Sequence, residues 1–341
     1  MKPIKIRNMK EFAAASGISR PTVSKYFNDP RSVTKSSRVR IEEALERFDY
    51  RPNIYAINQN RRQTKHIGVV VPYLADPVFA EMVRVIEWRC IRAGFSPTLF
   101  SAYGESALEV DLLENLRSMK PAGVLLAPLG RESDIAAIED FCRDVPTVLL
   151  DRNIEGLGEA FVGSNNHSFL SGTVEYLLST GEAPCFFEMR QPANPNAHKR
   201  REAYFAIMEQ LKLKPHRILL EGSGWGIEEV GRQGALQLLE EESLPTDTVL
   251  CSNDRLAFGF LSACFEKGIS VGRGKELRVA SHDNHPFSRF TCPPLTTAAH
   301  DYASVSEYAV KTLFRLIESG GRFSQREETL FPAQLIVRDS A

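Results

Sequence analysis

The first fifty residues carry apolar positions at helical spacing, interrupted by a turn signal. Residues 8–16 and 19–28 are two helix-length segments, and Gly17 between them permits a tight turn. Ser19 is a favourable helix cap, and Pro21 lies in the first turn, where its missing N–H is harmless. The pattern predicts two short helices joined as helix–turn–helix.

A third helix is predicted after Thr34, where one apolar stripe recurs at i, i+3, i+4 and i+7, formed by Ile41, Ala44, Leu45 and Phe48. Pro52 disfavours helix at the preceding residue and marks the end of this region. Residues 1–53 are therefore predicted to form a small all-α headpiece.

From residue 67 the pattern changes to short apolar runs that alternate with helix-length segments. This alternation is typical of parallel sheets covered by helices on both faces. Strands are predicted at residues 67–73, 97–102, 123–128, 147–152, 184–189, 217–221, 248–251, 277–281 and 330–337. Helices are predicted at residues 78–92, 108–119, 135–142, 170–178, 200–211, 230–241, 256–266 and 305–317.

Residues 67–341 are too many for one small core, so the sequence predicts two similar α/β lobes. Lobe 1 is expected to contain about residues 67–164 plus 299–325, and lobe 2 about residues 165–298 plus 326–341. A cleft between such lobes, at the carboxyl ends of the strands, is where a small molecule binds.

The charge is distributed unevenly along the chain. Residues 1–66 hold 15 Lys and Arg against 6 Asp and Glu, whereas the whole chain holds 42 and 43. A basic segment joined to an acidic remainder is typical of a nucleic-acid-binding head. The second helix is expected to turn Val23 and Phe27 inward and to present a polar, cationic face to the DNA major groove. The alternative is a solvated basic face on an ordinary helical domain.

Residues 54–66 connect the two regions. They contain the short helix-like run IYAINQN followed by Arg61, Arg62, Lys65 and His66. Seven residues do not hold a helix alone in water. This segment is therefore either a flexible linker or a hinge helix that forms only when paired on DNA.

Several signals are absent from the sequence. It has no apolar signal-peptide region and no apolar run long enough to span a membrane. The six cysteines show no CxxC spacing, which favours buried thiols in a reducing cytoplasm, and the seven histidines show no metal spacing. The glycine-rich run at residues 222–226 has Ile227 at the third fingerprint position, and no GxSxG or HExxH motif occurs. We expect no metal or other cofactor and no enzymatic activity.

An ordered set of motifs resembles the lactose-repressor (LacI/GalR) family of bacterial transcription regulators over essentially the whole chain. The motifs are GISRPTVSKYFN at residues 17–28, VTKSSR at 33–38, YRPN at 50–53, IGVVVP at 67–72, SND at 252–254, SHDN at 281–284, PPLTT at 293–297 and LIVR at 335–338. The resemblance implies a periplasmic-binding-protein-like core and an oligomer that binds a near-palindromic operator under the control of a metabolite. No heptad helix follows the last predicted strand, which favours a homodimer over a tetramer.

Within that resemblance, base readout falls on Arg20, Pro21 and Lys25. An arginine here binds a guanine edge in bidentate fashion, whereas proline offers only apolar contact. Phosphate contacts fall on Ser19, Thr22, Ser24 and Asn28, and hinge contacts fall on Tyr55, Ala56 and Gln59. Gln59 replaces the leucine that the family inserts into the minor groove, and a glutamine would part a base step poorly.

The resemblance places the ligand contacts on Phe79, Asp151, Arg152, Arg200, Trp225, Asn253, Asp283 and His300. Aromatic faces with planar charged groups at the rim suit a polyol or monosaccharide. Val78 and His300 depart from the ribose-type pattern, and Arg152, Lys199 and Arg200 would also accommodate a sugar acid or phosphate. Arg200 and Asp283 are expected to meet only around the ligand.

The sequence therefore predicts a cytoplasmic, operator-binding repressor controlled by a sugar-like molecule. A sugar-binding transport receptor with the same core is one alternative, opposed by the basic headpiece and the missing signal peptide. A cytosolic α/β enzyme acting on a sugar is the other, opposed by the absence of a paired nucleophile and base.

Overall fold

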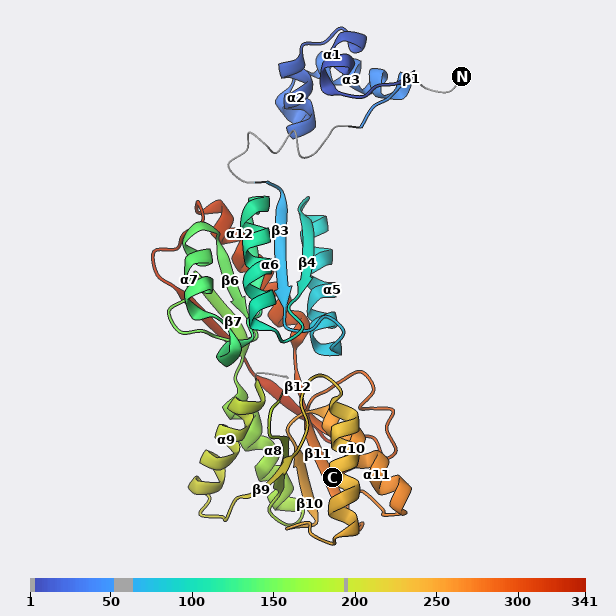
Figure 1. The fold of residues 1–341 in the computed structure, drawn as a ribbon, viewed down its shortest axis with the longest axis vertical. Coiled ribbons are helices and arrows are strands. Elements are labelled where there is room, and N and C mark those ends of the chain that lie inside the picture. The colour runs from blue at the N-terminus through green and yellow to red at the C-terminus, as the bar shows by residue number, and fades with distance from the viewer. Residues whose placement is uncertain (1–3, 52–63, 193–195) are drawn as a thin grey trace. The chain divides into compact units, whose positions relative to one another are not determined.

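The computed structural model describes residues 4–51, 64–192 and 196–341. The chain forms two compact units, Met1–Thr64 and Lys65–Ala341, which divide inside the segment predicted as a linker. The larger unit consists of two α/β lobes, each with its own sheet (Figure 1). The predicted fold class, a small helical headpiece plus a two-lobed α/β core, is confirmed.

The headpiece contains α1 (Met9–Ser16), α2 (Arg20–Asn28), a 3-10 turn at Pro30–Ser32 and α3 (Lys35–Arg47). Ser19 caps α2 as predicted, and Asn8 and Thr34 cap α1 and α3 in the same way, since each side chain accepts a hydrogen bond from the backbone N–H three residues later. Gly17 has a φ of 65°, the left-handed conformation that favours glycine at a helix end.

A compact apolar core holds these three helices together. Phe12, Val23 and Ile41, one from each helix, are fully buried. The Tyr50 ring stacks on that of Phe12 with a centroid distance of 4.6 Å. A short parallel pairing of β1 (Ile4–Lys5) with β2 (Phe48–Asp49), which the hydrophobic pattern did not predict, joins the two ends of the headpiece.

Lobe 1 is a six-stranded parallel sheet in the order β13-β7-β6-β5-β3-β4. Its helices α5 and α12 pack on one face, and α6 and α7 pack on the other. The strands are β3 (His66–Val71), β4 (Ser96–Ser101), β5 (Gly123–Leu126), β6 (Thr147–Leu150), β7 (Ala160–Ser164) and β13 (Glu327–Phe331). The helices are α5 (Pro77–Arg92), α6 (Ser106–Met119), α7 (Ile135–Asp144) and α12 (Tyr302–Glu318), with a 3-10 turn at Gly130–Glu132.

Lobe 2 is a second six-stranded sheet, in the order β14-β12-β11-β10-β8-β9, in which β14 alone runs antiparallel to its neighbour. Helices α8 and α9 cover one face, and α10 and α11 cover the other. The strands are β8 (Cys185–Met189), β9 (His216–Leu220), β10 (Thr248–Cys251), β11 (Arg278–Asp283), β12 (Thr296–His300) and β14 (Ala333–Ile336). The helices are α8 (Asn166–Thr180), α9 (Asn196–Gln210), α10 (Ile227–Glu240) and α11 (Asp254–Lys267).

The C-terminal segment is divided between the two lobes differently from the prediction. The single strand predicted at residues 330–337 is two strands in different sheets: β13 pairs with β7 of lobe 1, and β14 pairs with β12 of lobe 2. The assignment of residues 326–341 to lobe 2 was therefore wrong for Glu327–Phe331. Pro332 separates the two strands, because it has no N–H to continue the ladder.

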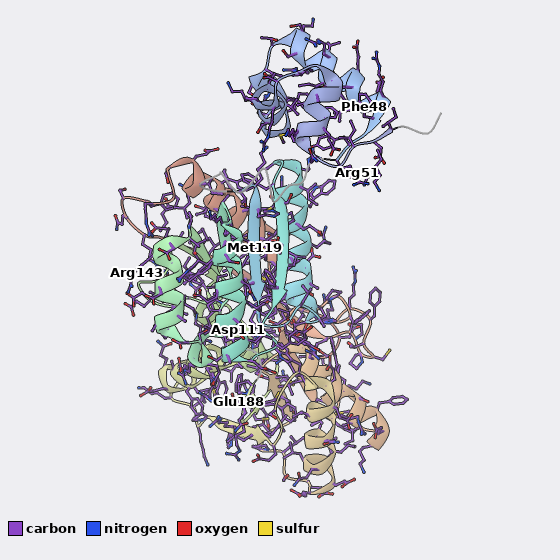
Figure 2. All side chains as sticks on the ribbon, turned by 45° about the horizontal axis from the view of Figure 1, so that its top comes forward. Phe48, Arg51, Asp111, Met119, Arg143 and Glu188 are labelled. Carbon is purple, nitrogen blue, oxygen red and sulfur yellow. The ribbon has the colours of Figure 1, made fainter. Side chains whose placement is uncertain are left out.

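Figure 2 shows the side chains on the helices and strands of the core, with Asp111, Arg143 and Glu188 among those labelled. Asp111 on α6 and Arg143 on α7 are exposed on the outer surface of lobe 1. Glu188 on β8 is one of several buried charged residues; it is fully buried and bonded to Arg217 with 2.5 Å between Nε and Oε1.

Candidate operator-reading helix and effector cleft

Helix α2 presents the cationic face that the sequence predicted. Arg20, Pro21 and Lys25 are exposed, whereas Val23 is fully buried and Phe27 packs against the headpiece core. A helix with an apolar inner face and an exposed cationic outer face is suited to lie in a DNA major groove.

Local hydrogen bonds fix the ends of α2. Ser19 and Thr22 lie with their hydroxyl oxygens 2.8 Å apart at the first turn. At the other end, the Lys25 carbonyl accepts a bond from the Ser32 hydroxyl at 3.1 Å. The Gly17 carbonyl accepts a bond from the Arg40 guanidinium at 3.0 Å, so α3 anchors the turn before α2. Thr22 and Ser24 are partly exposed.

Four of the predicted DNA contacts are outside the described part of the chain. They are the side chain of Asn28 and the hinge residues Tyr55, Ala56 and Gln59. The hinge-helix hypothesis accordingly stays a prediction.

In the core, the predicted ligand residues gather where strands end. Asp151 and Arg152 follow β6, Asn253 follows β10, and Asp283 is the last residue of β11. The carboxyl ends of parallel strands form one edge of a sheet, and lobes 1 and 2 turn these edges toward each other.

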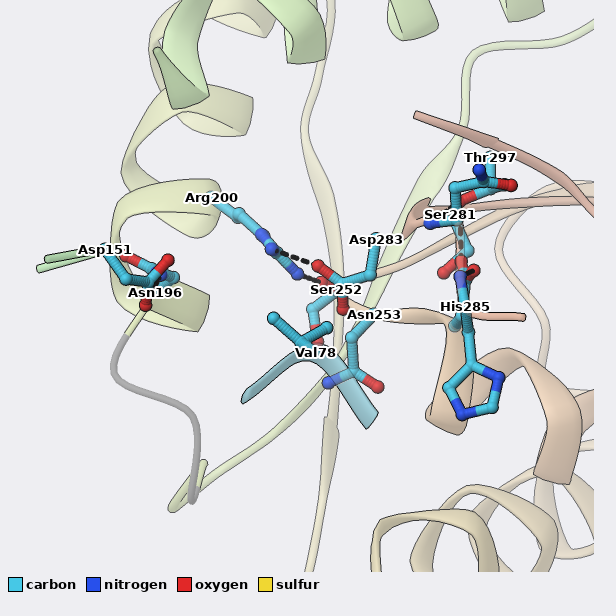
Figure 3. A network of polar contacts seen from close by, with 12 residues as sticks. Val78, Asp151, Asn196, Arg200, Ser252, Asn253, Ser281, Asp283, His285 and Thr297 are labelled. Atoms are coloured by element: carbon cyan, nitrogen blue, oxygen red, sulfur yellow. Dashed lines mark hydrogen bonds and ion pairs between the residues drawn. The ribbon is translucent and has the colours of Figure 1, made fainter. Parts of the chain in front are cut away.

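Arg200 and Asp283 form a direct, buried ion pair (Figure 3). Arg200 donates from one nitrogen to Oδ1 of Asp283 at 2.5 Å and from another to the Ser252 carbonyl at 2.7 Å. The two side chains are 2% and 7% exposed. The expectation that they meet only around a ligand was wrong, because α9 carries the guanidinium directly over the end of β11.

Asp283 also receives a bond from lobe 1. The Tyr302 hydroxyl, at the start of α12, donates to Oδ1 of Asp283 at 3.2 Å. Burial and the neighbouring carboxylates, Asp283 first among them, raise the pKa of Tyr302 well above its usual value, so this hydroxyl stays protonated and donates. The backbone of Asp283 has a φ of 112°, a strained conformation for a residue with a side chain.

Asp151 lies at the opposite side of the cleft, where it bonds to lobe 2. The Asn196 side chain, in the first turn of α9, donates to Oδ2 of Asp151 at 2.7 Å. Burial raises the pKa of Asp151, and the cations Lys199 and Arg200 act against that shift. Arg152 is buried against Gly130, where an added Cβ would lie 2.2 Å from the Arg152 Nε. Only a glycine leaves room for this guanidinium.

The positions of Trp225 and Asn253 are compatible with contacts to a ligand. The Trp225 ring stacks on Tyr73 of lobe 1 with a centroid distance of 4.5 Å and an interplanar angle of 18°. Asn253 accepts a bond from the Leu256 N–H at 2.9 Å through Oδ1 and so caps α11. Its side-chain N–H groups remain the part that can face a ligand.

His300 lies at the end of β12 and is 8% exposed. Burial, with Arg200 nearby, lowers the pKa of His300 to about 3, so its ring is neutral at physiological pH. A neutral imidazole here supplies one donor and one acceptor.

Phe79 does not reach the cleft. It is fully buried in the apolar core of lobe 1, among residues of α5, α12 and the sheet. Val78, one position earlier, is only partly buried and is drawn in the same close-up as Asn253 and Asp283 (Figure 3). A shift of one residue on a helix moves a side chain by about 100°, which is enough to exchange core and cleft positions.

The sequence reasoning missed four polar residues of this region. Asp76 caps α5 and forms an ion pair with Arg255 of α11. Tyr302 begins α12 and bonds to Asp283, and Asp254 is fully buried. The position of Asp76 before Pro77 is a helix-start signal that could have marked it. The pairing of Asp76 with Arg255 has no local signal, because 179 residues separate them.

Other features of the described residues are less informative. Residues 4–51, 64–192 and 196–341 contain no helix that could cross a membrane and no cluster of three His, Cys, Asp or Glu suited to a metal ion. A groove of about 730 Å³ lies on lobe 1 between α5 and α12, and none of the eight predicted ligand residues lines it.

The headpiece and the C-terminal part of the core match known family descriptions. Residues 8–53 match the model described as bacterial regulatory proteins of the lacI family. Residues 175–341 match the model described as a periplasmic binding protein-like domain.

Similar proteins cover nearly the whole chain. The transcriptional repressor PurR of Histophilus somni (strain 129Pt) is 27% identical over 334 residues, which is 97% of this chain and 98% of that protein. The NTD biosynthesis operon regulator NtdR of Bacillus subtilis (strain 168) is 24% identical over 97% of this chain and 98% of its own length. The crystal structure of the lac repressor dimer bound to operator and the anti-inducer ONPF superposes with a TM-score of 0.84 at 25% identity, covering 99% of each chain.

Proposed function

The chain belongs to the LacI family of bacterial regulatory proteins, and from that premise we propose that it represses transcription by binding operator DNA under the control of a sugar-like effector. The observation that carries the proposal is the exposed face of α2. Arg20, Pro21 and Lys25 project from a helix whose inner face is buried, on a unit that is basic while the rest of the chain is acidic.

The effector site is proposed to lie between the two lobes of the core. Polar side chains from both lobes converge there: Arg200, Asn253, Asp283 and His300 are buried, and Asp151 and Tyr302 are half-buried. Planar charged groups beside the Trp225 ring suit a polyhydroxylated ring, and a sugar acid or phosphate also finds cations in Arg152 and Lys199.

We propose that the protein acts as a cytoplasmic homodimer without enzymatic activity. The relatives named above are transcriptional regulators, and the lac repressor binds its operator as a dimer. Large apolar side chains that a partner subunit could cover are exposed on the core, including Trp88, Ile91, Phe265, Phe287 and Phe290.

The test of operator reading compares two arginine variants of the full chain. Binding sites are first selected from genomic fragments with the wild-type protein. Arg20→Ala is then expected to weaken binding to a selected site by roughly 1–3 kcal/mol and to relax the preference at one base pair in each half-site. Arg47→Ala is the matched control, because Arg47 is an exposed arginine in the last turn of α3. Equal losses on the selected site and on random DNA would contradict base readout by Arg20.

The effector hypothesis is tested by a thermal-shift screen of sugars, sugar acids and sugar phosphates. A ligand at a hundred times its Kd stabilises the protein by roughly 2.7 kcal/mol. A hit should also change the fraction of DNA bound at fixed protein concentration. A hit that is consumed on incubation would indicate an enzyme.

A further inference from the structure

Arg255 is the one residue of the described cleft that ion-pairs with both lobes at once. It is the second residue of α11 in lobe 2 and is 15% exposed. Its Nη1 donates to Oδ2 of Asp76 in lobe 1 at 3.2 Å. Its Nε and Nη2 donate to the two oxygens of Glu228 in lobe 2 at 2.6 and 2.7 Å. This planar fork therefore holds carboxylates from the two sides of the cleft.

The carboxylates around Arg255 would repel one another without it. Asp76 is 4% exposed, and its Oδ1 accepts a bond from the Val78 N–H at 3.0 Å, so the side chain cannot turn away. Burial, and after it the negative charge of Asp283 in lobe 2, raise the pKa of Asp76 to about 6. Closing the lobes thus brings Asp76 of lobe 1 close to Glu228 and Asp283 of lobe 2. Asp283 is paired with Arg200, and Arg255 supplies the opposite charge to Asp76 and Glu228.

An apolar contact between the lobes lies directly beside this cation. Arg255 donates from Nη2 to the Trp225 carbonyl at 2.7 Å, and the Trp225 ring stacks on Tyr73 of lobe 1. Trp225 packs against the apolar cores of both lobes. Beside this stack the Arg255 and Asp76 side chains are only 15% and 5% exposed, which strengthens the electrostatic interaction between them.

We propose that Arg255 is the closing residue of the core, which holds the two lobes together without an effector by bridging Asp76 of lobe 1 and Glu228 of lobe 2. This inference deepens the proposed function, because it assigns the control of lobe closure to the chain's own residues. An effector then binds to a cleft that is already closed at this edge and changes DNA binding by competing with this bridge.

Loss of Arg255 and loss of Asp76 should have different effects on lobe closure. Loss of Arg255 leaves Asp76 and Glu228 buried or half-buried without their cation, which is the costly way to break such a pair. Loss of the Asp76 charge leaves Arg255 paired with Glu228 and removes one repelling group. Arg255→Met should therefore open the lobes, and adding Asp76→Asn should close them again.

The experiment measures the distance between spin labels on the two lobes of the full chain, with no effector or DNA added. Labels are placed at exposed Asp111 of α6 and exposed Ser243 beyond α10, after Cys292, the one exposed cysteine among the six, is replaced by serine. Labelled protein is diluted with unlabelled protein so that the pair within one chain dominates. Wild type should give a single short distance.

Arg255→Met should lower the closed-to-open ratio by at least about tenfold and add a longer distance. Arg232→Met is the matched control, because Arg232 of α10 pairs only with Glu229 and Glu266 inside lobe 2, and its distance should equal that of wild type. The double variant Asp76→Asn/Arg255→Met should recover the short distance. Arg255→Lys keeps the charge without the fork and should give a mixture of both distances, which provides a test should the methionine variant fail to fold.

An unchanged distance in Arg255→Met, or no recovery in the double variant, would overturn the closing role. Neither outcome bears on operator reading by Arg20, which is measured separately on DNA.

Discussion

At the residue scale, a mutation of Asp283 affects both stability and effector binding, because Asp283 forms a buried ion pair with Arg200 and belongs to the proposed effector site. Removing one partner of a buried ion pair costs about 3–5 kcal/mol, because the remaining charge is left uncompensated. Asp283→Ala is therefore expected to lower the free energy of unfolding of the unliganded core by about that amount, in addition to weakening effector binding. Urea unfolding without ligand checks the first effect, and calorimetry with a screened ligand checks the second.

The control for this prediction removes both charges. Arg200→Met/Asp283→Leu replaces the pair by apolar groups and should restore much of the stability without restoring effector binding. If Asp283→Ala unfolds at the wild-type urea concentration, the pair contributes nothing to the folded core.

Buried titratable groups also set the pH of greatest stability. Burial, with Asp283 nearby, raises the pKa of Asp254 to about 7, although the carboxylate accepts bonds from the Ser288 hydroxyl, the Thr297 hydroxyl and the His285 N–H. The folded state then binds a proton more tightly than the unfolded state. Taken alone, this carboxyl contributes about 0.8 kcal/mol more stability at pH 6.5 than at pH 8.

From about pH 7.5 downward the histidines act in the opposite direction. Burial lowers the pKa values of His282 and His300, so the unfolded state takes up their protons first and stability falls with the pH. The two trends predict a maximum near pH 6–7 in denaturant midpoints measured from pH 5 to 8. A midpoint that climbs steadily up to pH 8 would contradict the raised pKa of Asp254.

At the scale of elements, the turn between α1 and α2 depends on one backbone conformation. Gly17 has a φ of 65°, and the Ile18 N–H returns to the Ala13 carbonyl at 3.1 Å. Gly17→Ala should destabilise the headpiece by about 1–2 kcal/mol, because a side chain is strained in the left-handed region. The loss should appear in operator binding and in hydrogen exchange of α1 and α2.

The opposite sign is expected for a glycine inside a helix. Gly172 of α8 has open space around an added Cβ and no positive φ, so Gly172→Ala should be neutral or stabilising by up to about 1 kcal/mol. Equal effects of the two substitutions would mean that the Gly17 conformation is not required.

Some strands could be predicted from the sequence because their runs of apolar residues are almost uninterrupted. Buried runs such as HIGVVV in β3 are continuous in Val and Ile, which is the pattern of a strand covered on both faces. In contrast, β12 has the sequence TTAAH, and β13 has alternating half-buried and exposed residues at the edge of its sheet. Such strands owe their place to pairing partners far along the chain, which a local pattern does not contain.

At the scale of the whole molecule, the sequence predicted where polar residues of the two lobes gather, but not how they pair. Polar residues after β6, β10 and β11 were predictable, because parallel strands place their carboxyl ends together. The contacts of Arg255 with Asp76, and of Tyr302 with Asp283, arise only when the two lobes face each other. Phe79 was wrongly predicted to contact the ligand, because the resemblance assigns a residue to a position on the helix but does not give the direction of its side chain.

The division of the chain into two units makes the last prediction. A fragment that begins at Lys65 retains every strand of both lobes and the four apolar clusters of the core, none of which includes a headpiece residue. It should unfold cooperatively and bind a screened effector with the affinity of the full chain, yet it should not bind the selected operator, because α2 is missing.

A second fragment separates this prediction from general tolerance to truncation. A chain that begins at Tyr73 lacks β3, which pairs with both β4 and β5 inside the sheet of lobe 1. Removing an interior strand exposes the apolar faces of α5 and α6 and leaves two ladders unpaired, so this fragment should not fold. Circular dichroism and thermal melting of the two fragments make the comparison. Operator binding by the Lys65 fragment would place the DNA contacts in the core and remove the headpiece from the mechanism.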